Sequence, residues 1–386
     1  MRTIGVVTTA RSDYGIYLPV LRRIQADPGL RLQLLVTGMH LSPEFGLTAR
    51  TIESDGFEIS ERLEMLLSSD TPAGVGKSMG LGLIGFAEAY ARGRPDILVV
   101  LGDRFEMHAA ALAALPFKIP VAHIHGGELT RGAIDDALRH CITKLSHLHF
   151  VATQEYARRV EQMGEEPARV FVTGALSLDN LDSVSLLTTA ELEAKFGLHL
   201  GSPPLLVTFH PVTLEYEQTE WQTQELLAAL ETVDQPVVFT LPNADTNGRV
   251  IIRLIEAFVR THPQAQIVEN LGTQGYFSMM RLATAMVGNS SSGIIEAPSF
   301  GLPVVNIGRR QAGRMRAKNV IDVDHERAAI DSGIRRALSP AFREGLRGLI
   351  NPYHAGGDAA GHIVERLRTA MLDNRLLCKA FHDLSQ

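Results

Sequence analysis

The chain alternates between two hydrophobic patterns along most of its length. Short apolar runs rich in β-branched residues predict buried strands, and apolar residues spaced three and four positions apart predict amphipathic helices. In the first half, we predict strands at 3–8, 32–36, 97–101, 121–124, 150–152 and 170–172, and helices at 17–25, 79–90, 107–115 and 133–148. This alternation of strand and helix predicts a parallel sheet with helices on both of its faces.

The second half repeats the same pattern. We predict strands at 205–209, 237–240, 265–268, 285–287, 304–306 and 320–321, and helices at 220–231, 250–261, 276–283, 294–300, 327–338 and 359–372. The segment 178–204 ends with polar, glycine and proline residues, and we expect it to join the halves. The sequence therefore predicts two doubly wound domains facing each other across a cleft. Ligands of such sheets bind beyond the carboxyl ends of the strands.

Composition removes several classes of protein. With 386 residues, 45% hydrophobic and 21% charged, the chain can bury two cores and is not disordered. The net charge of −6 leaves no basic excess for a nucleic acid partner. Two cysteines without zinc-like spacing predict neither a disulfide framework nor a metal site. No signal-peptide pattern and no apolar run of about 18 residues appear, so we expect a cytoplasmic protein without a membrane partner.

Ionisable side chains follow three predicted strands of the first half. Arg11 follows the first strand, Asp103 follows 97–101, and His125 and Glu128 flank two glycines after 121–124. Each has a simpler explanation by itself: a surface turn for Arg11, a helix cap for Asp103, and a plain turn around the glycines. Because these strand ends meet at one sheet edge, the set favours a catalytic site.

The helix predicted at 133–148 carries further charges. Asp135 and Arg139 are four residues apart on one helical face, as are Asp136 and His140. A surface ion pair is the commoner explanation of such spacing. Together with the strand ends before it, the helix adds Asp135 and Arg139 to the predicted site.

The second half has a different set of polar residues at its strand ends. His210 ends the strand 205–209, and Asn243 lies in a turn after 237–240. Three serines in Asn-Ser-Ser-Ser-Gly, residues 289–293, precede a predicted helix, where hydroxyl groups and unpaired N–H groups bind anions. A well-capped helix is the alternative explanation.

Two further groups extend this predicted anion site. Glu296 can accept hydrogen bonds from a ribose diol, and Arg314 belongs to an arginine cluster that can neutralise a diphosphate. The chain lacks GxGxxG after its first strand and lacks GxxxxGK[ST] altogether. A nicotinamide cofactor and a P-loop are therefore not expected.

In combination, these motifs resemble those of a known family. The segments ARSDYG, VVLGDRFE, HIHGGE, IDDALRH, FHPVT, GNSSSGIIEAPS and NIGRRQAGR are similar to those of hydrolysing UDP-N-acetylglucosamine 2-epimerases. The resemblance extends to relatives that act on UDP-N,N′-diacetylbacillosamine in legionaminic acid synthesis. It implies a GT-B fold with an N-terminal Rossmann-like domain over 1–185, a UDP-binding domain over 186–358, and a C-terminal helix over 359–386 that returns to the first domain.

The resemblance implies an activity without a cofactor. A base removes the C2 proton while UDP leaves C1, and water then adds to the resulting glycal. UDP-N-acetylglucosamine would give free N-acetylmannosamine and UDP for a sialic-type pathway, and UDP-N,N′-diacetylbacillosamine is the alternative substrate. The family also implies a homodimer or homotetramer.

The resemblance assigns roles residue by residue. Asp103, Asp135, Arg139 and His210 match active-site positions. Asp103 and Asp135 are candidate general acid/base groups. His125 occupies the place of the catalytic glutamate of non-hydrolysing relatives, so His125 or Glu128 takes over that role or the mechanism is rearranged, and the C2 base stays open. The remaining positions match substrate or UDP contacts: Arg11, Asn243, Asn289, Ser290, Ser291, Glu296 and Arg314.

Other functions share parts of this pattern. A GT-B glycosyltransferase would have the same architecture and nucleotide site but would need an acceptor. A non-catalytic UDP-sugar sensor would keep the serines and Glu296 but would not need Asp103 and Asp135. A non-hydrolysing epimerase would release a UDP-sugar, and HIHGGE with IDDALRH argues against it.

Overall fold

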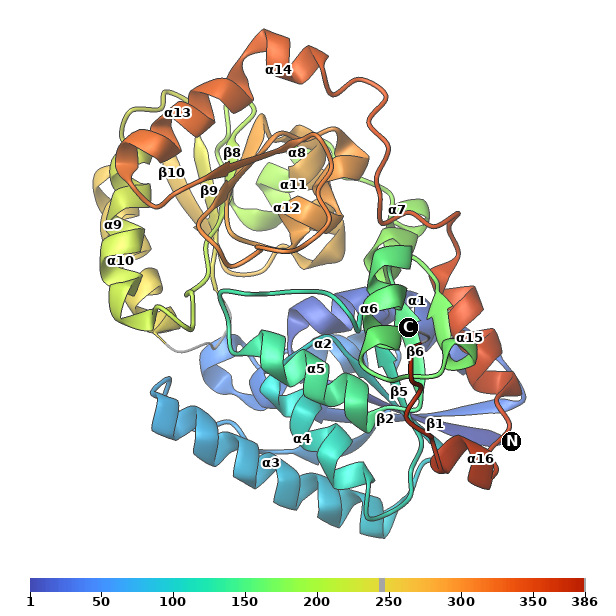
Figure 1. Ribbon diagram of the computed structural model, residues 1–386. Helices are drawn as coiled ribbons and strands as arrows, with labels where there is room; N and C mark the ends of the chain where they lie inside the picture. The colour runs from blue at the N-terminus through green and yellow to red at the C-terminus, as the bar shows by residue number, and fades with distance from the viewer. Residues whose placement is uncertain (243–246, 385–386) are drawn as a thin grey trace. The chain divides into compact units, whose positions relative to one another are not determined.

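The computed structural model describes residues 1–242 and 247–384, which form two compact units. Unit 1 comprises Met1–Glu128, Asp135–Asp182 and the chain from Tyr353 onward. Unit 2 comprises Leu129–Ile134 and Ser183–Pro352. Each unit is a parallel sheet covered by helices (Figure 1), so the predicted α/β class with two Rossmann-like units is confirmed. The predicted cleft stays a prediction.

Unit 1 contains a parallel sheet with the strand order β3-β2-β1-β4-β5-β6-β7. The central strands are buried on both faces, which is why they appear in the sequence as continuous apolar runs. The strands are β1 (Arg2–Thr8), β2 (Leu30–Thr37), β3 (Ile59–Leu63), β4 (Ile97–Leu101), β5 (Val121–Ile124), β6 (Leu148–Val151) and β7 (Val170–Val172).

Two groups of helices cover the sheet of unit 1. Helices α3 (Pro72–Arg92), α4 (Phe105–Ala114) and α5 (Asp135–Leu145) lie side by side, and α1 (Arg11–Ala26) packs beside α15 (Ala359–Thr369), as Figure 1 shows. Arg2 donates to backbone carbonyls at the end of α15. The C-terminal helix therefore belongs to the core of unit 1. The other helices are α2 (Ala49–Ser54), α6 (Gln154–Gln162), α7 (Asp179–Ser183) and α16 (Asn374–Leu377).

Unit 2 has a second parallel sheet, in the order β10-β9-β8-β11-β12-β13. Its strands are β8 (Leu205–Thr208), β9 (Val237–Thr240), β10 (Ala265–Val268), β11 (Ala285–Gly288), β12 (Val304–Ile307) and β13 (Val320–Val323). Helices α9 (Thr219–Leu230), α10 (Gly248–Thr261) and α13 (Arg327–Leu338) pack together, and α8 (Thr189–Phe196) packs with α11 (Gly272–Leu282). Two short helices, α12 (Ser292–Ile295) and α14 (Pro340–Glu344), complete the unit.

Several local expectations were wrong or incomplete, and helices α6 and α8 were not predicted. The edge strand β3 was missed because more exposed and less exposed residues alternate along it. It contains Glu61 and Arg62 and only two apolar residues, Ile59 and Leu63. Helix α3 begins earlier than predicted, in a glycine-rich stretch, and α1 already begins at Arg11. The helix predicted over 294–300 is one α-helical turn, α12, followed by a 3-10 turn at Ala297–Phe300.

One internal segment is assigned to a different unit from its neighbours in the chain. Leu129–Ile134 groups with unit 2, although the residues on both sides of it belong to unit 1. Within unit 2, the backbone of Gly132 accepts a hydrogen bond from Leu214 N at 3.2 Å, and Ile134 N donates to Thr213 Oγ1 at 3.0 Å. This segment is called the strap below.

Candidate active site

The predicted site residues follow the central strands of each sheet. In unit 1, β1 and β4 are neighbours at the position where the strand order reverses, and they lead to Arg11 and Asp103. In unit 2, β8 and β11 occupy the equivalent position and lead to His210 and Asn289. Such a topological switch point is where open α/β sheets bind ligands.

Arg139 on α5 is the centre of the charged cluster in unit 1. Its guanidinium pairs with Asp103, donates from Nη1 to the His125 carbonyl at 2.7 Å, and lies 3.9 Å from Glu128 Oε2. The Arg139 side chain is only 3% exposed, so the pair with Asp103 is screened little by solvent. One buried guanidinium thus joins the ends of β4 and β5, which the sequence predicted to lie together.

This arrangement excludes the simpler explanation of Asp103. Helix α4 begins at Phe105 with Arg104 at the cap position and no side-chain cap hydrogen bond, so Asp103 is not the cap. Its carboxylate is directed to Arg139 instead. On α5, Asp136 lies 3.7 Å from His140, four residues further along the helix, and Asp135 is the first, half-buried residue of the helix.

His125 and Glu128 form a buried pair after β5. His125 Nδ1 lies 2.6 Å from Glu128 Oε1, and both side chains are nearly inaccessible to solvent. The backbone of His125 has a φ of +64°, which non-glycine residues rarely adopt. Gly127 has a φ of +75°, and a Cβ there would lie 2.5 Å from the Tyr156 carbonyl, so this position requires glycine. The HGG turn is therefore a strained, closely packed structure and not a plain turn.

Buried polar residues that the sequence analysis did not select support this cluster. His123 lies behind the turn, with Nε2 2.7 Å from the Gly102 carbonyl, and burial lowers its pKa to about 3. Arg104 pairs with the fully buried Glu106 at 2.9 Å. Burial raises the pKa of Glu106, and the Arg104 charge opposes that rise. The GDRFE motif did contain a signal for this pair, because Arg104 and Glu106 are oppositely charged residues within three positions after Asp103.

A second buried group fixes the turn that carries Arg11. Asp13 accepts hydrogen bonds from Thr8 Oγ1 at 2.7 Å and from Thr9 N at 2.9 Å, and His40 contacts Thr8 at 3.0 Å. Burial would raise the pKa of Asp13, but the hydrogen bonds and the charge of His40 outweigh burial and lower it. The aspartate of ARSDYG therefore orders the start of α1, and Arg11 is the first, partly buried residue of that helix.

In unit 2, Asn289 holds the end of β8. Its Oδ1 accepts from His210 N at 2.7 Å, and its Nδ2 donates to the His210 carbonyl at 2.8 Å. Gly288 makes this approach possible, because a Cβ there would lie 2.0 Å from the Thr208 carbonyl. The side chain of Asn289, predicted to contact UDP, thus positions the backbone of the nearly buried His210.

The three serines lie beside a tyrosine. Tyr276 on α11 makes side-chain hydrogen bonds with Ser290 and Ser292, and burial raises the pKa of its hydroxyl, with the Glu296 charge adding to the rise. Ser290, Ser291 and Ser292 are half-buried. Glu296 is 6% exposed and follows α12 directly. Because α12 has a single turn, its dipole contributes little, and any anion here would be bound by hydroxyl and N–H groups.

Arginines after β12 contact the strap. Arg314 is nearly buried and donates from Nε to the Leu129 carbonyl at 3.0 Å and from Nη2 to Thr130 Oγ1 at 3.4 Å. Arg310 donates to the Asn289 carbonyl at 3.2 Å. Asn243, the remaining predicted contact, lies outside the described residues.

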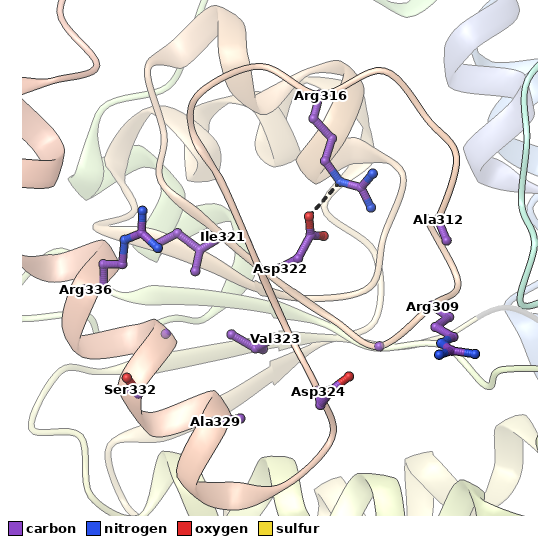
Figure 2. Close-up of a pocket in the computed structure, with 12 residues that line it drawn as sticks. Arg309, Ala312, Arg316, Ile321, Asp322, Val323, Asp324, Ala329, Ser332 and Arg336 are labelled. Carbon is purple, nitrogen blue, oxygen red and sulfur yellow. Dashed lines mark ion pairs between the residues drawn. The ribbon is translucent and has the colours of Figure 1, made fainter.

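The part of unit 2 between β12, β13 and α13 also contains a cavity of about 590 Å³ (Figure 2). Arg309, Arg316 and Arg336 line it, and Arg316 Nε pairs with Asp322 at 3.0 Å. Ser290, Ser291, Ser292 and Glu296 are not among the residues that line this cavity. The predicted nucleotide contacts therefore do not coincide with it.

Over residues 1–242 and 247–384, no group of three or more His, Cys, Asp or Glu side chains is arranged to hold a metal ion. Among the described helices, none is both long and apolar enough to cross a membrane.

Comparison with known proteins identifies the relatives of this chain. The family model for UDP-N-acetylglucosamine 2-epimerase matches residues 22–368. A GDP/UDP-N,N′-diacetylbacillosamine 2-epimerase (hydrolyzing) of Campylobacter jejuni is 40% identical over 345 residues, or 89% of each chain. A UDP-N,N′-diacetylbacillosamine 2-epimerase (hydrolyzing) of Legionella pneumophila is 38% identical over 99% of this chain and all of its own length.

Solved structures establish the fold class. The crystal structure of a Neisseria meningitidis UDP-GlcNAc 2-epimerase bound to UDP-GlcNAc aligns with a TM-score of 0.80, at 21% identity, over 95% of this chain and 99% of that chain. The fold is thus GT-B, built from two Rossmann-like units, as predicted. The chain belongs to the UDP-N-acetylglucosamine 2-epimerase family and is an enzyme of the hydrolysing UDP-sugar 2-epimerase type.

Proposed function

We propose that the enzyme converts UDP-N,N′-diacetylbacillosamine to the free 2-epimer and UDP, as a step in nonulosonic acid synthesis. The charged cluster of His125, Glu128, Arg139 and Asp103 carries the proposal, because it supplies several proton-transfer groups at one sheet edge. The choice of sugar is supported by the names of the two relatives at 40% and 38% identity.

The proposed reaction has two stages. First, the C1–O bond breaks with its electron pair going to the UDP oxygen, the C2–H bond breaks with its proton going to a base, and a C1–C2 double bond forms. Water then adds its hydroxyl group to C1, and a proton is delivered to C2 on the opposite face. Asp103 and Asp135 are the proposed groups for this proton delivery and for activation of water.

Unit 2 is proposed to bind UDP. In this proposal, Ser290 and Ser291 offer hydroxyl groups to the diphosphate, Glu296 accepts from the ribose diol, and His210 assists departure of the phosphate. Arg314 and Arg11 are proposed to neutralise diphosphate charge. Support comes from the burial of Glu296, His210 and Arg314, each between 6% and 8% exposed.

A second substrate has its own support. The family model that matches residues 22–368 is described as UDP-N-acetylglucosamine 2-epimerase, which keeps UDP-N-acetylglucosamine, with N-acetylmannosamine as product, as the second candidate. A cytoplasmic location stays a prediction. A homodimer or homotetramer also stays a prediction, and gel filtration with light scattering would test the oligomeric state.

The test is an NMR assay in D₂O with each UDP-sugar supplied separately and no acceptor present. Release of UDP together with a free 2-epimer carrying deuterium at C2 would support elimination and hydration, and the faster reaction identifies the sugar. Consumption of neither sugar without an acceptor would overturn the proposal in favour of a glycosyltransferase or a sensor. A UDP-linked product would instead indicate a non-hydrolysing epimerase.

A further inference from the structure

The buried pair after β5 distinguishes between two residues that the sequence left open as the C2 base. We propose that His125 Nε2 removes the C2 proton and that Glu128 is not the base but fixes and stabilises the imidazole. This assignment rests on the proposed function, because it concerns the elimination stage of that reaction.

The hydrogen bond between the two side chains determines the tautomer of His125. Arg139 lies 3.9 Å from the second carboxylate oxygen of Glu128, which favours the ionised form of the carboxylate. An ionised carboxylate only accepts hydrogen bonds, so His125 Nδ1 must carry the proton in the 2.6 Å contact with Oε1. In the neutral ring, Nε2 then has a lone pair that can accept a proton.

The surroundings of Nε2 indicate that its partner is a ligand. Within the described residues, Nε2 of His125 is buried and has no hydrogen-bond partner. A buried polar atom without a partner costs free energy, and in native proteins it is usually found at a functional site or beside a bound molecule. Glu128 differs, because its two oxygens face His125 and Arg139.

The backbone shows that the position of the ring is imposed by its neighbours. His125 N donates to the Phe150 carbonyl at 2.8 Å, and the His125 carbonyl accepts from Arg139 at 2.7 Å. These two bonds hold the residue at its unfavourable φ of +64°. A strained non-glycine residue fixed on both sides, with a lone pair left unpaired, is the geometry expected of a preorganised base.

The proton balance of the step is complete. The C2–H bond breaks, Nε2 takes the proton and becomes part of an imidazolium, and the bonding pair forms the C1–C2 double bond as UDP leaves with the C1–O pair. Glu128 stabilises the imidazolium through the Nδ1–H hydrogen bond. The ring returns to its neutral form when the proton is released to solvent water.

His125→Gln is the main test, because an amide can still donate to Glu128 but cannot take a proton. We expect kcat to fall about 10²–10⁴-fold, the range for general-base removal. UDP affinity by calorimetry and the urea unfolding midpoint should stay close to those of the wild type. A His125→Gln enzyme that keeps more than a tenth of the wild-type kcat would overturn the assignment.

His125→Gly is the second variant and guards against a folding artefact, because glycine adopts a positive φ without strain. Free imidazole should restore part of its activity, and the restored reaction should show a primary isotope effect with a C2-deuterated sugar. Lys118→Gly is the matched control, since Lys118 is an exposed residue at φ +53°. Absence of imidazole rescue in a folded His125→Gly enzyme would overturn the assignment.

Glu128→Gln tests the positioning role by its pH profile. The charged or titratable groups that face His125 are Glu128, Arg139 and His123. The substitution removes the anion that stabilises the imidazolium form of His125, so the acidic limb of the kcat/KM profile should move to lower pH. An unmoved limb would mean that Glu128 has only a structural role, and it would overturn that part of the proposal.

The controls separate this inference from the proposed function. A wild-type enzyme that consumes neither UDP-sugar would overturn both. An active wild type, combined with a His125→Gln variant that still incorporates deuterium at C2 at a comparable rate, would overturn the base assignment alone.

Discussion

The sheet edges of the two units use different chemistry at the same topological position. In unit 1 the strand ends carry charged groups that pair with one another, with Arg139 between Asp103 and Glu128. In unit 2 the ends of β8 and β11 carry amide and hydroxyl groups, with Asn289 holding His210 and Tyr276 bonded to serines, while the charged Glu296 and Arg314 lie farther along the chain. Buried charges suit proton transfer, and neutral donors suit binding of an anion without a large desolvation cost. The difference predicts that changes in the charged cluster of unit 1 lower kcat and that changes in the serines of unit 2 raise KM.

The largest expected effect is that of Asp103→Asn. This change removes a proposed proton-transfer group while preserving its shape, so kcat should fall about 10²–10⁴-fold with KM nearly unchanged. Steady-state kinetics of UDP release would measure it. Asp136→Asn, on helix α5, is the control and should stay within about twofold, because the partly exposed carboxylate of Asp136 pairs with His140 and not with Arg139 or Glu128. Equal losses in both variants would argue against a specific role for Asp103.

Arg139→Met should affect stability as well as activity. Removing the buried guanidinium leaves Asp103 and Glu128 without their shared cation, which should cost about 3–5 kcal/mol in the free energy of unfolding. Urea denaturation would measure the loss. Arg335→Met, which removes a 72% exposed arginine paired with Asp331, should change stability by about 0.5 kcal/mol or less. If Arg139→Met also changed the free energy of unfolding by only about 0.5 kcal/mol, charge pairing with Arg139 would not be what holds the cluster in place.

Glu165 is the centre of a buried charge cluster of unit 1 that lies outside the candidate site. A substitution of Glu165 tests whether such a cluster affects catalysis. Burial would raise its pKa, but hydrogen bonds from His149, Lys144 and Lys379 lower it to about 2. Because the folded-state pKa lies below the ordinary value, this stabilisation is present above about pH 4.5 and is lost as the pH falls toward 2.

Glu165→Gln should therefore reduce stability by about 2 kcal/mol at pH 7 and flatten the loss of stability between pH 5 and pH 2. Thermal unfolding across that pH range would measure both effects. The kcat of the variant should match that of the wild type at a temperature where both are folded. A lower kcat would mean that charge pairing anywhere in unit 1 affects the reaction.

The smallest effect is expected for Ser290→Ala in unit 2. Loss of the proposed hydroxyl hydrogen bond to the diphosphate should raise KM about fivefold, which corresponds to about 1 kcal/mol, with kcat nearly unchanged. Kinetics and UDP calorimetry would measure it. Ser54→Ala, which removes an exposed hydroxyl that donates within α2, is the matched control and should have no effect. A fall in kcat without a change in KM would contradict the division of roles between the units.

The accuracy of the sequence analysis differed between elements for physical reasons. Strands β4, β5, β7, β9 and β10 were predicted to the residue, because each is a short run of mostly apolar, β-branched or aromatic residues bounded by polar or turn residues. The edge strand β3 was missed because it is only partly buried, so its sequence is not a continuous apolar run. It forms part of the sheet through its pairing with β2. The length of helix α12 was overestimated. The helix stops after one turn because a proline and a glycine interrupt the apolar stretch that follows it.

The sequence by itself determined the two parallel sheets, the polar residues at their strand ends and the family, because these depend on local hydrophobic patterns and residue order. Only the tertiary structure decided that Arg139 pairs with Asp103, that Glu128 binds His125, that Asn289 holds His210, and that the strap 129–134 groups with unit 2. These contacts join residues from different elements, and their partners depend on strand order, burial and backbone strain. A single sequence does not encode such pairings in any local pattern.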